Sequence, residues 1–154
     1  MLSETMAKDL KTLVKRCMDS TLYCTVATYE KGSVWAAPVV FAYDHNFNLY
    51  FISGPKSRHM MNISRNKKVA VAIYTTRQKI TGPKIGVQLE GSAEWVRGPM
   101  NVLKAYRLYF SRNVKWKGAT LKYFKSARAL VKINTTKLFY FNNSMFGEER
   151  QRAI

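Results

Sequence analysis

The stretch YFISGPKSRHMMNI, residues 50–63, joins a strand, a turn and the start of a helix. The residues YFIS are typical of a strand, Gly54 and Pro55 indicate a turn, and a short helix is predicted over residues 57–65. Between the turn and the helix stands a group of hydrogen-bond donors: Lys56, Ser57, Arg58 and His59. Donors beside a helix N-terminus are the arrangement in which proteins bind phosphate.

Length and composition indicate one globular unit. The chain has 154 residues, of which 47% are hydrophobic, so it can build a core and we expect a single domain over residues 1–154. The longest apolar run, residues 34–43, is about half of the roughly 20 residues that a membrane-spanning helix needs, so no span is expected. The N-terminal residues MLSETMAKDL lack the apolar core of a secretory signal, which favours a cytoplasmic location.

The two cysteines, Cys17 and Cys24, stand seven positions apart with no CxxC motif and no histidine nearby. This spacing fits neither a zinc site nor a disulfide framework. We therefore expect two buried thiols and no metal site.

The charge is strongly basic, with 26 Lys and Arg residues against 9 Asp and Glu residues and a net charge of +17. No acidic residue occurs over residues 45–89 or 95–147. Such a field attracts anions, which include phosphorylated small molecules, nucleic acid and acidic lipid surfaces. A solvated basic surface without a partner is the alternative, and charge alone does not choose between them.

Hydrophobic periodicity predicts an α+β fold that is mainly β. Helices are expected over residues 4–18 and 57–65 and from Pro99 onward. Strands are expected over residues 22–28, 34–43, 49–53, 69–74, 86–96, 129–133 and 138–141. In GVQLEGSAEWV, residues 86–96, apolar and polar residues alternate, as in a barrel wall with one wet side. The pattern favours a small antiparallel barrel with two or three peripheral helices.

The order of these elements resembles the flavin-binding split barrel of the pyridoxamine 5'-phosphate oxidase family. The resemblance covers roughly residues 10–141 and rests on AAPVVF, on LYFIS followed by GPKSRHMMNI, on VAVAIY and on GVQLEGSAEWV. It implies an antiparallel split β-barrel, FMN as the cofactor, and a homodimer with the flavins at the subunit interface.

The resemblance also assigns roles to individual residues. It implies that Pro38, Val39 and Val40 line the flavin ring, that Ser53 donates from the strand end, and that Ser57, Arg58 and His59 hold the phosphate. The remaining cofactor-binding candidates are Lys56, Asn62, Gln88, Tyr106 and Asn142. Candidates for contacts from the second subunit are Tyr106, Phe110, Asn142, Asn143 and Phe146. His59 departs from the better-known oxidases, in which a lysine follows the arginine.

Several of these residues also have a purely structural interpretation. Ser57 is well placed to be the N-cap of its helix, and Lys56 to be a solvated loop charge. Met60 and Met61 are typical core residues, and His45 is expected to be exposed in a turn. The second-subunit candidates also fit ordinary packing of a terminal helix and strand.

The sequence contains no Ser-His-Asp set, no HExxH motif and no P-loop, so any catalysis must come from a cofactor. We therefore expect an FMN-dependent oxidoreductase or flavin carrier whose small-molecule substrate is unknown, with an anion as one candidate class. Vitamin B6 oxidation is not predicted, because the substrate-phosphate residues of those oxidases have no counterpart. The alternatives are a basic barrel that binds nucleic acid, which is not favoured, and a haem-binding barrel that would use His45 or His59.

Overall fold

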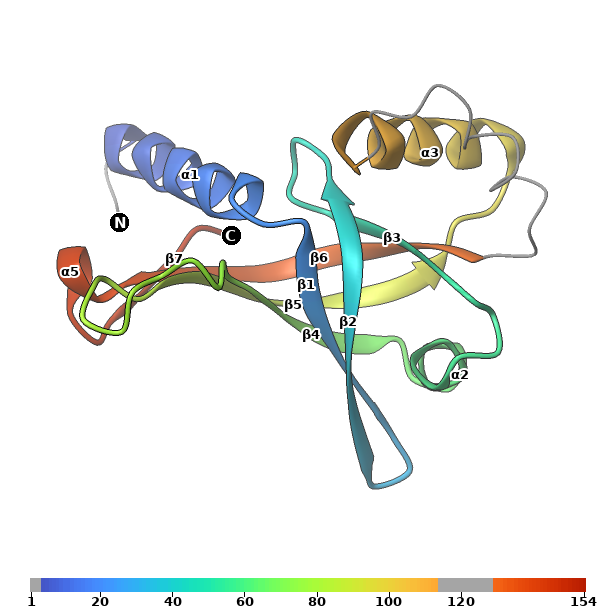
Figure 1. Cartoon of the computed structure of the whole chain (residues 1–154). Helices are drawn as coiled ribbons and strands as arrows, with labels where there is room; N and C mark the ends of the chain where they lie inside the picture. Colours follow the sequence, from blue (N-terminus) through green and yellow to red (C-terminus); the bar gives the residue numbers. More distant parts are fainter. Residues whose placement is uncertain (1–3, 114–128) are drawn as a thin grey trace.

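The structure is a computed structural model that describes residues 4–113 and 129–154. Seven strands form one antiparallel sheet in the order β3-β2-β1-β4-β5-β6-β7 (Figure 1). Their bounds are β1 Tyr23–Glu30, β2 Ser33–Tyr43, β3 Leu49–Ser53, β4 Lys68–Ile73, β5 Ile85–Trp95, β6 Ala129–Asn142 and β7 Arg150–Arg152. Pairing of β3 with β6 closes the first six strands into a barrel. The predicted split barrel, mainly β with peripheral helices, is confirmed.

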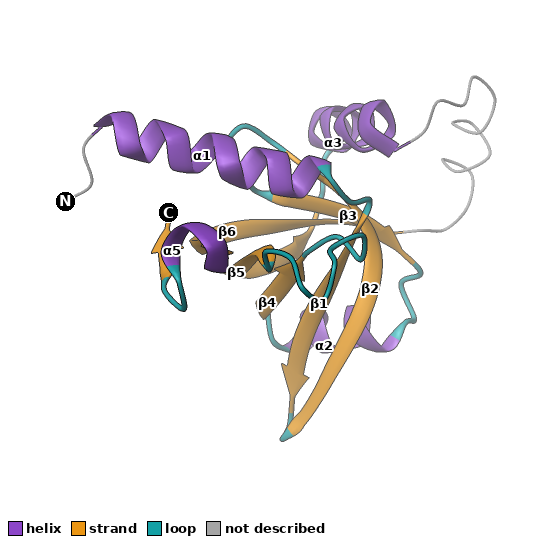
Figure 2. Cartoon of the chain, turned by 60° about the vertical axis from the view of Figure 1, so that its left-hand side comes forward, coloured by secondary structure: helices purple, strands orange, loops and turns teal. Residues whose placement is uncertain are grey.

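The helices lie around this barrel (Figure 2). Their bounds are α1 Glu4–Asp19, α2 Arg58–Arg65, α3 Pro99–Asn113 and α5 Asn143–Phe146. Helix α1 packs on β5 and β6, α2 packs on β1 and β2, and α3 packs on β2, β3 and β6. Within the described parts of the chain, no helix is long and apolar enough to cross a membrane.

The barrel interior is filled by apolar side chains that alternate along each strand with outward-facing residues. Val26, Phe41, Phe51 and Ile133 are completely buried there. Both cysteines are buried free thiols, as predicted, and burial raises the pKa of Cys17 to about 11 and that of Cys24 to about 12. They are therefore protonated near pH 7 and act as small core side chains.

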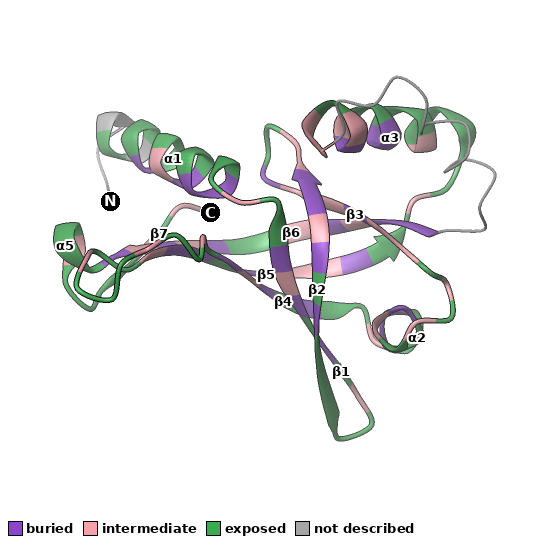
Figure 3. Cartoon of the chain, viewed as in Figure 1, coloured by how far each residue is buried: buried purple, intermediate pink, exposed green. Residues whose placement is uncertain are grey.

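The β1–β2 hairpin extends beyond the barrel, and its tip is exposed (Figures 1 and 3). Both turn residues adopt positive φ angles, 47° at Lys31 and 77° at Gly32, which matches the right-handed twist of the two strands. The strand predicted over residues 22–28 continues to Glu30, because residues near the tip still pair with β2 although they leave the core.

The last barrel strand differs from the prediction. Instead of two strands over residues 129–133 and 138–141, β6 runs unbroken from Ala129 to Asn142. The polar residues between the predicted strands, NTTK, pair with β5 through a bulge, at which Thr136 is the extra residue opposite the step from Glu90 to Gly91. A Cβ atom on Gly91 would lie 2.6 Å from the Asn134 carbonyl oxygen, so this close approach requires glycine.

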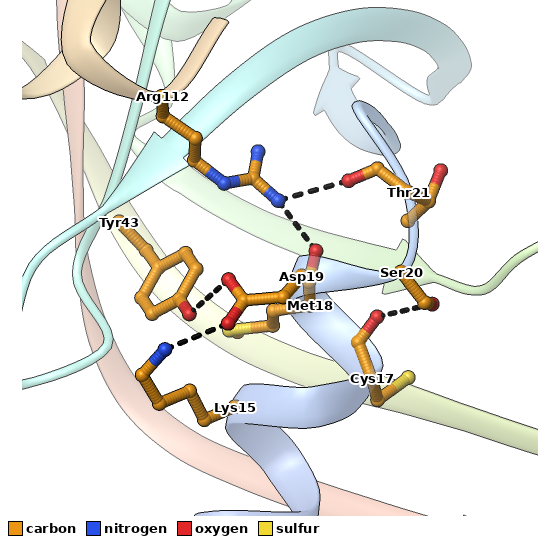
Figure 4. A network of polar contacts seen from close by, with 8 residues as sticks. All are labelled: Lys15, Cys17, Met18, Asp19, Ser20, Thr21, Tyr43 and Arg112. Atoms are coloured by element: carbon orange, nitrogen blue, oxygen red, sulfur yellow. Dashed lines mark hydrogen bonds and ion pairs between the residues drawn. The ribbon is translucent and has the colours of Figure 1, made fainter.

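One arginine joins α3 to α1 and β2 (Figure 4). Arg112 donates to the carbonyl oxygens of Met18, Phe41 and Thr21, the last at 2.8 Å. Two of these carbonyls lie where α1 ends and β1 approaches, and no helical N–H groups remain to satisfy them. Arg112 therefore holds the C-terminal end of α1 against the barrel.

Candidate functional site

Three polar side chains meet where β3 ends and α2 begins. The Ser53 hydroxyl lies 2.7 Å from His59 Nε2 and 3.2 Å from the Ser57 hydroxyl, and Ser57 lies 3.1 Å from the same imidazole nitrogen. All three side chains are half-buried. The structure therefore brings together Ser53, Ser57 and His59, here called the SSH cluster.

The His59 imidazole favours its neutral form. Burial lowers the pKa of His59 below its ordinary value of 6.5, because a charged ring is poorly solvated there. One ring nitrogen cannot satisfy two hydroxyl groups fully, since it either accepts one proton or donates its own. The SSH cluster therefore retains hydrogen-bonding capacity for an incoming oxygen atom.

Ser57 does not cap α2 through its side chain. It occupies the N-cap position in an extended conformation, but its hydroxyl accepts no hydrogen bond from the first turn of the helix. The interpretation of Ser57 as only an N-cap is therefore wrong. Its hydroxyl belongs to the SSH cluster instead.

Arg58 points away from the SSH cluster toward the β1–β2 hairpin. Its Nη2 atom donates to the Ser33 hydroxyl at 2.7 Å, and its guanidinium carbon lies 4.4 Å from the centre of the Trp35 ring. The side chain is exposed, and Lys56 beside it is an exposed loop residue with no hydrogen bond to any described residue. Arg58 thus lies on one side of the α2 N-terminus and the SSH cluster on the other.

Asn62 braces the same region from one turn further along α2. Its Nδ2 atom donates to the Thr28 hydroxyl at 3.0 Å, and that hydroxyl donates to the Trp35 carbonyl oxygen at 3.3 Å. Both Asn62 and Thr28 are buried. This relay joins α2 to both strands of the hairpin and positions Arg58 and the ring beneath it.

The predicted ring-lining residues fall on different sides of β2. Pro38 is exposed on the outer face, Val39 is part of the core, and Val40 is half-buried. The Val39 side chain therefore cannot contact a ligand outside the barrel, and this residue could contribute only its backbone. Gln88 lies on the outer face in the same cross-strand row as Pro38, and its Oε1 atom accepts from Arg150 Nε at 2.8 Å.

The other candidates lie on different elements. Tyr106 is buried on α3 against Leu130 and stacks on Phe110 with ring centres 5.8 Å apart. Asn142 is buried and caps α5 by accepting from Ser144 N. Asn143 accepts from Lys84 N at 2.7 Å, and Phe146 packs edge-on against Tyr140. Each has a packing role within its own chain, and none of them belongs to the SSH cluster.

The outer face of β2, β1 and β4 is mainly apolar. Small side chains lie side by side across it, namely Ala27, Ala36 and Ala70. Larger exposed side chains, Tyr29 and Val34, lie beside them on the same face. Together with the neighbouring part of β5 they form an open hollow of about 1090 Å³.

Comparison with known proteins identifies the family. Residues 10–142 match the family model described as pyridoxamine 5'-phosphate oxidase. The chain belongs to this family. No curated protein sequence matches the chain.

Solved structures share the fold at low sequence identity. A protein of unknown function from Agrobacterium tumefaciens is 15% identical with a TM-score of 0.71, and the match covers 92% of this chain and 58% of that one. A heme binding protein from Mycobacterium smegmatis is 16% identical with a TM-score of 0.72, with coverage of 99% and 59%. An FAD binding protein from the same organism is 16% identical with a TM-score of 0.61, with coverage of 92% and 95%. This chain thus spans less than two thirds of the first two structures.

The sequence did not predict the hydrogen-bond partners of Arg58 and Asn62. Ser33, which binds Arg58, and Thr28, which binds Asn62, carry no motif. Each is more than twenty positions from its partner, so no local spacing connects them. Only the packing of α2 against the hairpin brings these residues together.

Proposed function

We propose that this protein binds FMN and acts as a flavin-dependent oxidoreductase on a small molecule, with an organic anion as the preferred class. The observation that carries the proposal is the group of donors at the start of α2, with the SSH cluster on one side of the helix N-terminus and Arg58 on the other. Two hydroxyls, an imidazole and an exposed guanidinium are donors that suit a terminal phosphate. Family membership supports the same assignment.

The donors and the outer face of the sheet together suit the two halves of a flavin mononucleotide. Arg58 uses one of its five N–H donors on Ser33, so the others remain available to phosphate oxygens. The row of small exposed side chains Ala27, Ala36 and Ala70 offers a surface against which a planar ring can lie. When bound, FMN would supply the electron-transfer chemistry, while the chain would bind and orient it.

The decisive experiment compares two ligands that differ only in the phosphate. Arg58→Ala should weaken FMN binding by roughly 10- to 150-fold, the equivalent of about 1.5 to 3 kcal/mol for a charge-assisted contact. Riboflavin binding should change much less. Fluorescence-quenching titrations at fixed salt measure both, since the +17 field adds a screened attraction of its own.

Arg65→Ala is the matched control, because Arg65 is the exposed arginine at the other end of α2. It should leave both affinities nearly unchanged. Equal losses for FMN and riboflavin in Arg58→Ala would make Arg58 a structural residue. No binding of FMN by the wild-type protein at millimolar concentration would remove the proposal.

The proposal includes a homodimer. The exposed apolar outer face of β2, β1 and β4 supports it, because a second copy would cover side chains that water solvates poorly. Ala36→Arg should place a charge in that face and shift the protein toward a species of 17.7 kDa in light scattering. Ser111→Arg, on the exposed side of α3, should leave the mass unchanged, and a wild-type monomer would contradict the dimer.

Haem is the second candidate ligand, and the similarity to a heme binding protein of Mycobacterium smegmatis supports it. The chain has two histidines, and His45 is exposed in the turn between β2 and β3, where an axial ligand would be accessible. Titration with haemin distinguishes the candidates. A sharp absorption band of bound haem that appears with the wild-type protein and is absent with His45→Gln would favour haem over flavin.

A further inference from the structure

The connection between β4 and β5, residues 74–84, is here called the β4–β5 loop. Helix α2 ends at Arg65 just before β4 begins, and the loop follows the other end of that strand, so the two lie at opposite ends of β4 (Figure 1). The loop is therefore remote from the SSH cluster and from Arg58. Figure 3 shows that most of it is exposed.

Side chains of the loop hold its backbone in one conformation. The Lys84 ammonium group donates to three carbonyl oxygens, those of Lys79, Ile80 and Gly82. The Gln78 side chain pairs with the backbone of Ile85, accepting from its N–H at 2.7 Å and donating to its carbonyl oxygen at 2.6 Å. The loop is therefore preorganised, which lowers the entropy that binding a partner would cost.

The loop is also joined to α5. The Asn143 side chain accepts from Lys84 N at 2.7 Å, and Asn143 N donates to the Lys84 carbonyl oxygen at 3.3 Å. Met145, two positions further along α5, is 56% exposed. The loop and α5 therefore form one continuous surface at this end of the barrel.

An apolar side chain lies at the tip of the loop. Ile80 is 93% exposed, more than any other large apolar residue that the structure describes. A turn places it there, since Gly82 N donates to the Lys79 carbonyl oxygen at 3.1 Å and Ile80 is the second of the four turn residues. Water therefore surrounds a side chain that burial would stabilise.

Cations flank this apolar tip. Arg77 and Lys79 are exposed, and neither forms an ion pair with any residue that the structure describes. The loop contains no acidic residue. The turn after α5 carries Glu148 and Glu149, which the two arginines of β7 match in number. The excess positive charge of this end of the barrel therefore lies on the loop.

We propose that the β4–β5 loop docks the protein on anionic lipid surfaces, with Ile80 inserted at the boundary between headgroups and acyl chains and with Arg77 and Lys79 on the headgroup phosphates. A bilayer opens around a projecting apolar side chain, whereas a folded partner would need a preformed hole for it. Basic residues beside the tip add attraction to anionic headgroups, which at physiological salt acts within about 8 Å. The proposal is independent of flavin binding, because no cofactor candidate lies in the loop.

The test is co-sedimentation with lipid vesicles at physiological salt. The wild-type protein should partition onto vesicles of phosphatidylcholine and phosphatidylglycerol in equal parts, and not onto phosphatidylcholine alone. Arg77→Gln/Lys79→Gln should lower partitioning by roughly 25-fold, since each basic residue near an anionic surface contributes about a factor of five. Ile80→Ser should lower it by about 10-fold through the lost apolar insertion. Ile80→Trp should strengthen it, because tryptophan favours the membrane interface.

Each kind of variant has a matched control away from the loop. Lys67→Gln/Lys68→Gln removes the same charge at the other end of β4, and Leu103→Ser removes an exposed apolar side chain from α3. Both should retain nearly full partitioning. An equal loss in the charge control would assign the binding to the general basic field and overturn the proposal, as would no binding of the wild-type protein to the mixed vesicles.

Two further outcomes separate lipid docking from other kinds of binding. A soluble polyanion such as RNA would use the two cations without the apolar tip, so unchanged vesicle partitioning in Ile80→Ser would contradict the proposal. Arg58→Ala should partition as the wild-type protein does. A loss in Arg58→Ala equal to that in Arg77→Gln/Lys79→Gln would show that the vesicles bind at α2 rather than at the β4–β5 loop.

Discussion

Arg112 and Arg58 both stack on aromatic rings, yet they differ in what their N–H groups reach. The Arg112 guanidinium lies 4.2 Å from the centre of the Phe41 ring and donates to three backbone carbonyls. The Arg58 guanidinium lies 4.4 Å from the centre of the Trp35 ring and donates to one serine hydroxyl. Stacking alone therefore does not distinguish a structural arginine from one available to a ligand.

The number and kind of acceptors make the distinction. Backbone carbonyls cannot move away, and Arg112 donates to two of them, those of Met18 and Thr21, at the end of α1 (Figure 4). A serine hydroxyl rotates and is easily replaced by a phosphate oxygen. The comparison predicts that stability depends mainly on Arg112 and ligand affinity mainly on Arg58.

The largest expected effect is on stability at Arg112. Arg112→Met removes the donor to the Met18 and Thr21 carbonyls and leaves the Phe41 carbonyl with Asn113 Nδ2, so the free energy of unfolding should fall by roughly 2 to 5 kcal/mol. Urea denaturation measures it. Arg107→Met, at an exposed position of the same helix, should cost less than about 0.5 kcal/mol. Similar losses in the two variants would contradict the structural role of Arg112.

A smaller effect is expected where α2 is joined to the hairpin. Asn62→Ala should lower the free energy of unfolding by about 1 to 3 kcal/mol, because the buried Thr28 hydroxyl loses its donor. A cycle with Thr28→Val isolates the interaction, since the double variant should cost less than the sum of the single ones. Additive losses would show that the Asn62 to Thr28 contact is not a stabilising one.

Arg58 is expected to contribute little to stability. Its exposed stacking on Trp35 and one hydrogen bond to Ser33 predict a loss below about 1 kcal/mol for Arg58→Ala. The same denaturation experiment measures it, with Arg65→Ala as the reference. A loss comparable to that of Arg112→Met would remove the contrast between the two arginines and make Arg58 structural.

The smallest effect concerns the dependence of stability on pH at His59. Because burial lowers its pKa in the folded protein, the unfolded chain binds more protons between that pKa and about 6.5. The free energy of unfolding should therefore decrease as pH falls below about 6.5 and level off below the folded pKa. His59→Gln should flatten this part of the profile, and His45→Gln should not. An unchanged slope in His59→Gln would contradict the buried neutral imidazole.

Local sequence patterns predicted most of the fold. The alternation along residues 86–96 and the apolar positions of α1 specified strand and helix directly, because side-chain periodicity reflects one buried face. The break predicted within β6 was wrong, since NTTK has the composition of a turn but lies opposite a bulge. Polarity reports exposure to water, whereas pairing depends on the neighbouring strand.

The candidate site also contains contacts that follow from local sequence and contacts that depend on the tertiary structure. The sequence explains why Ser53, Ser57 and His59 lie together, because a strand end, a tight turn and a helix start hold residues a few positions apart in one place. It could not place Arg58 over Trp35 or join Asn62 to Thr28, because each pair comes from two segments that are distant in the sequence. Contacts within about one turn of chain follow from backbone geometry, but those between distant segments exist only once the barrel has closed and packing has chosen which faces meet.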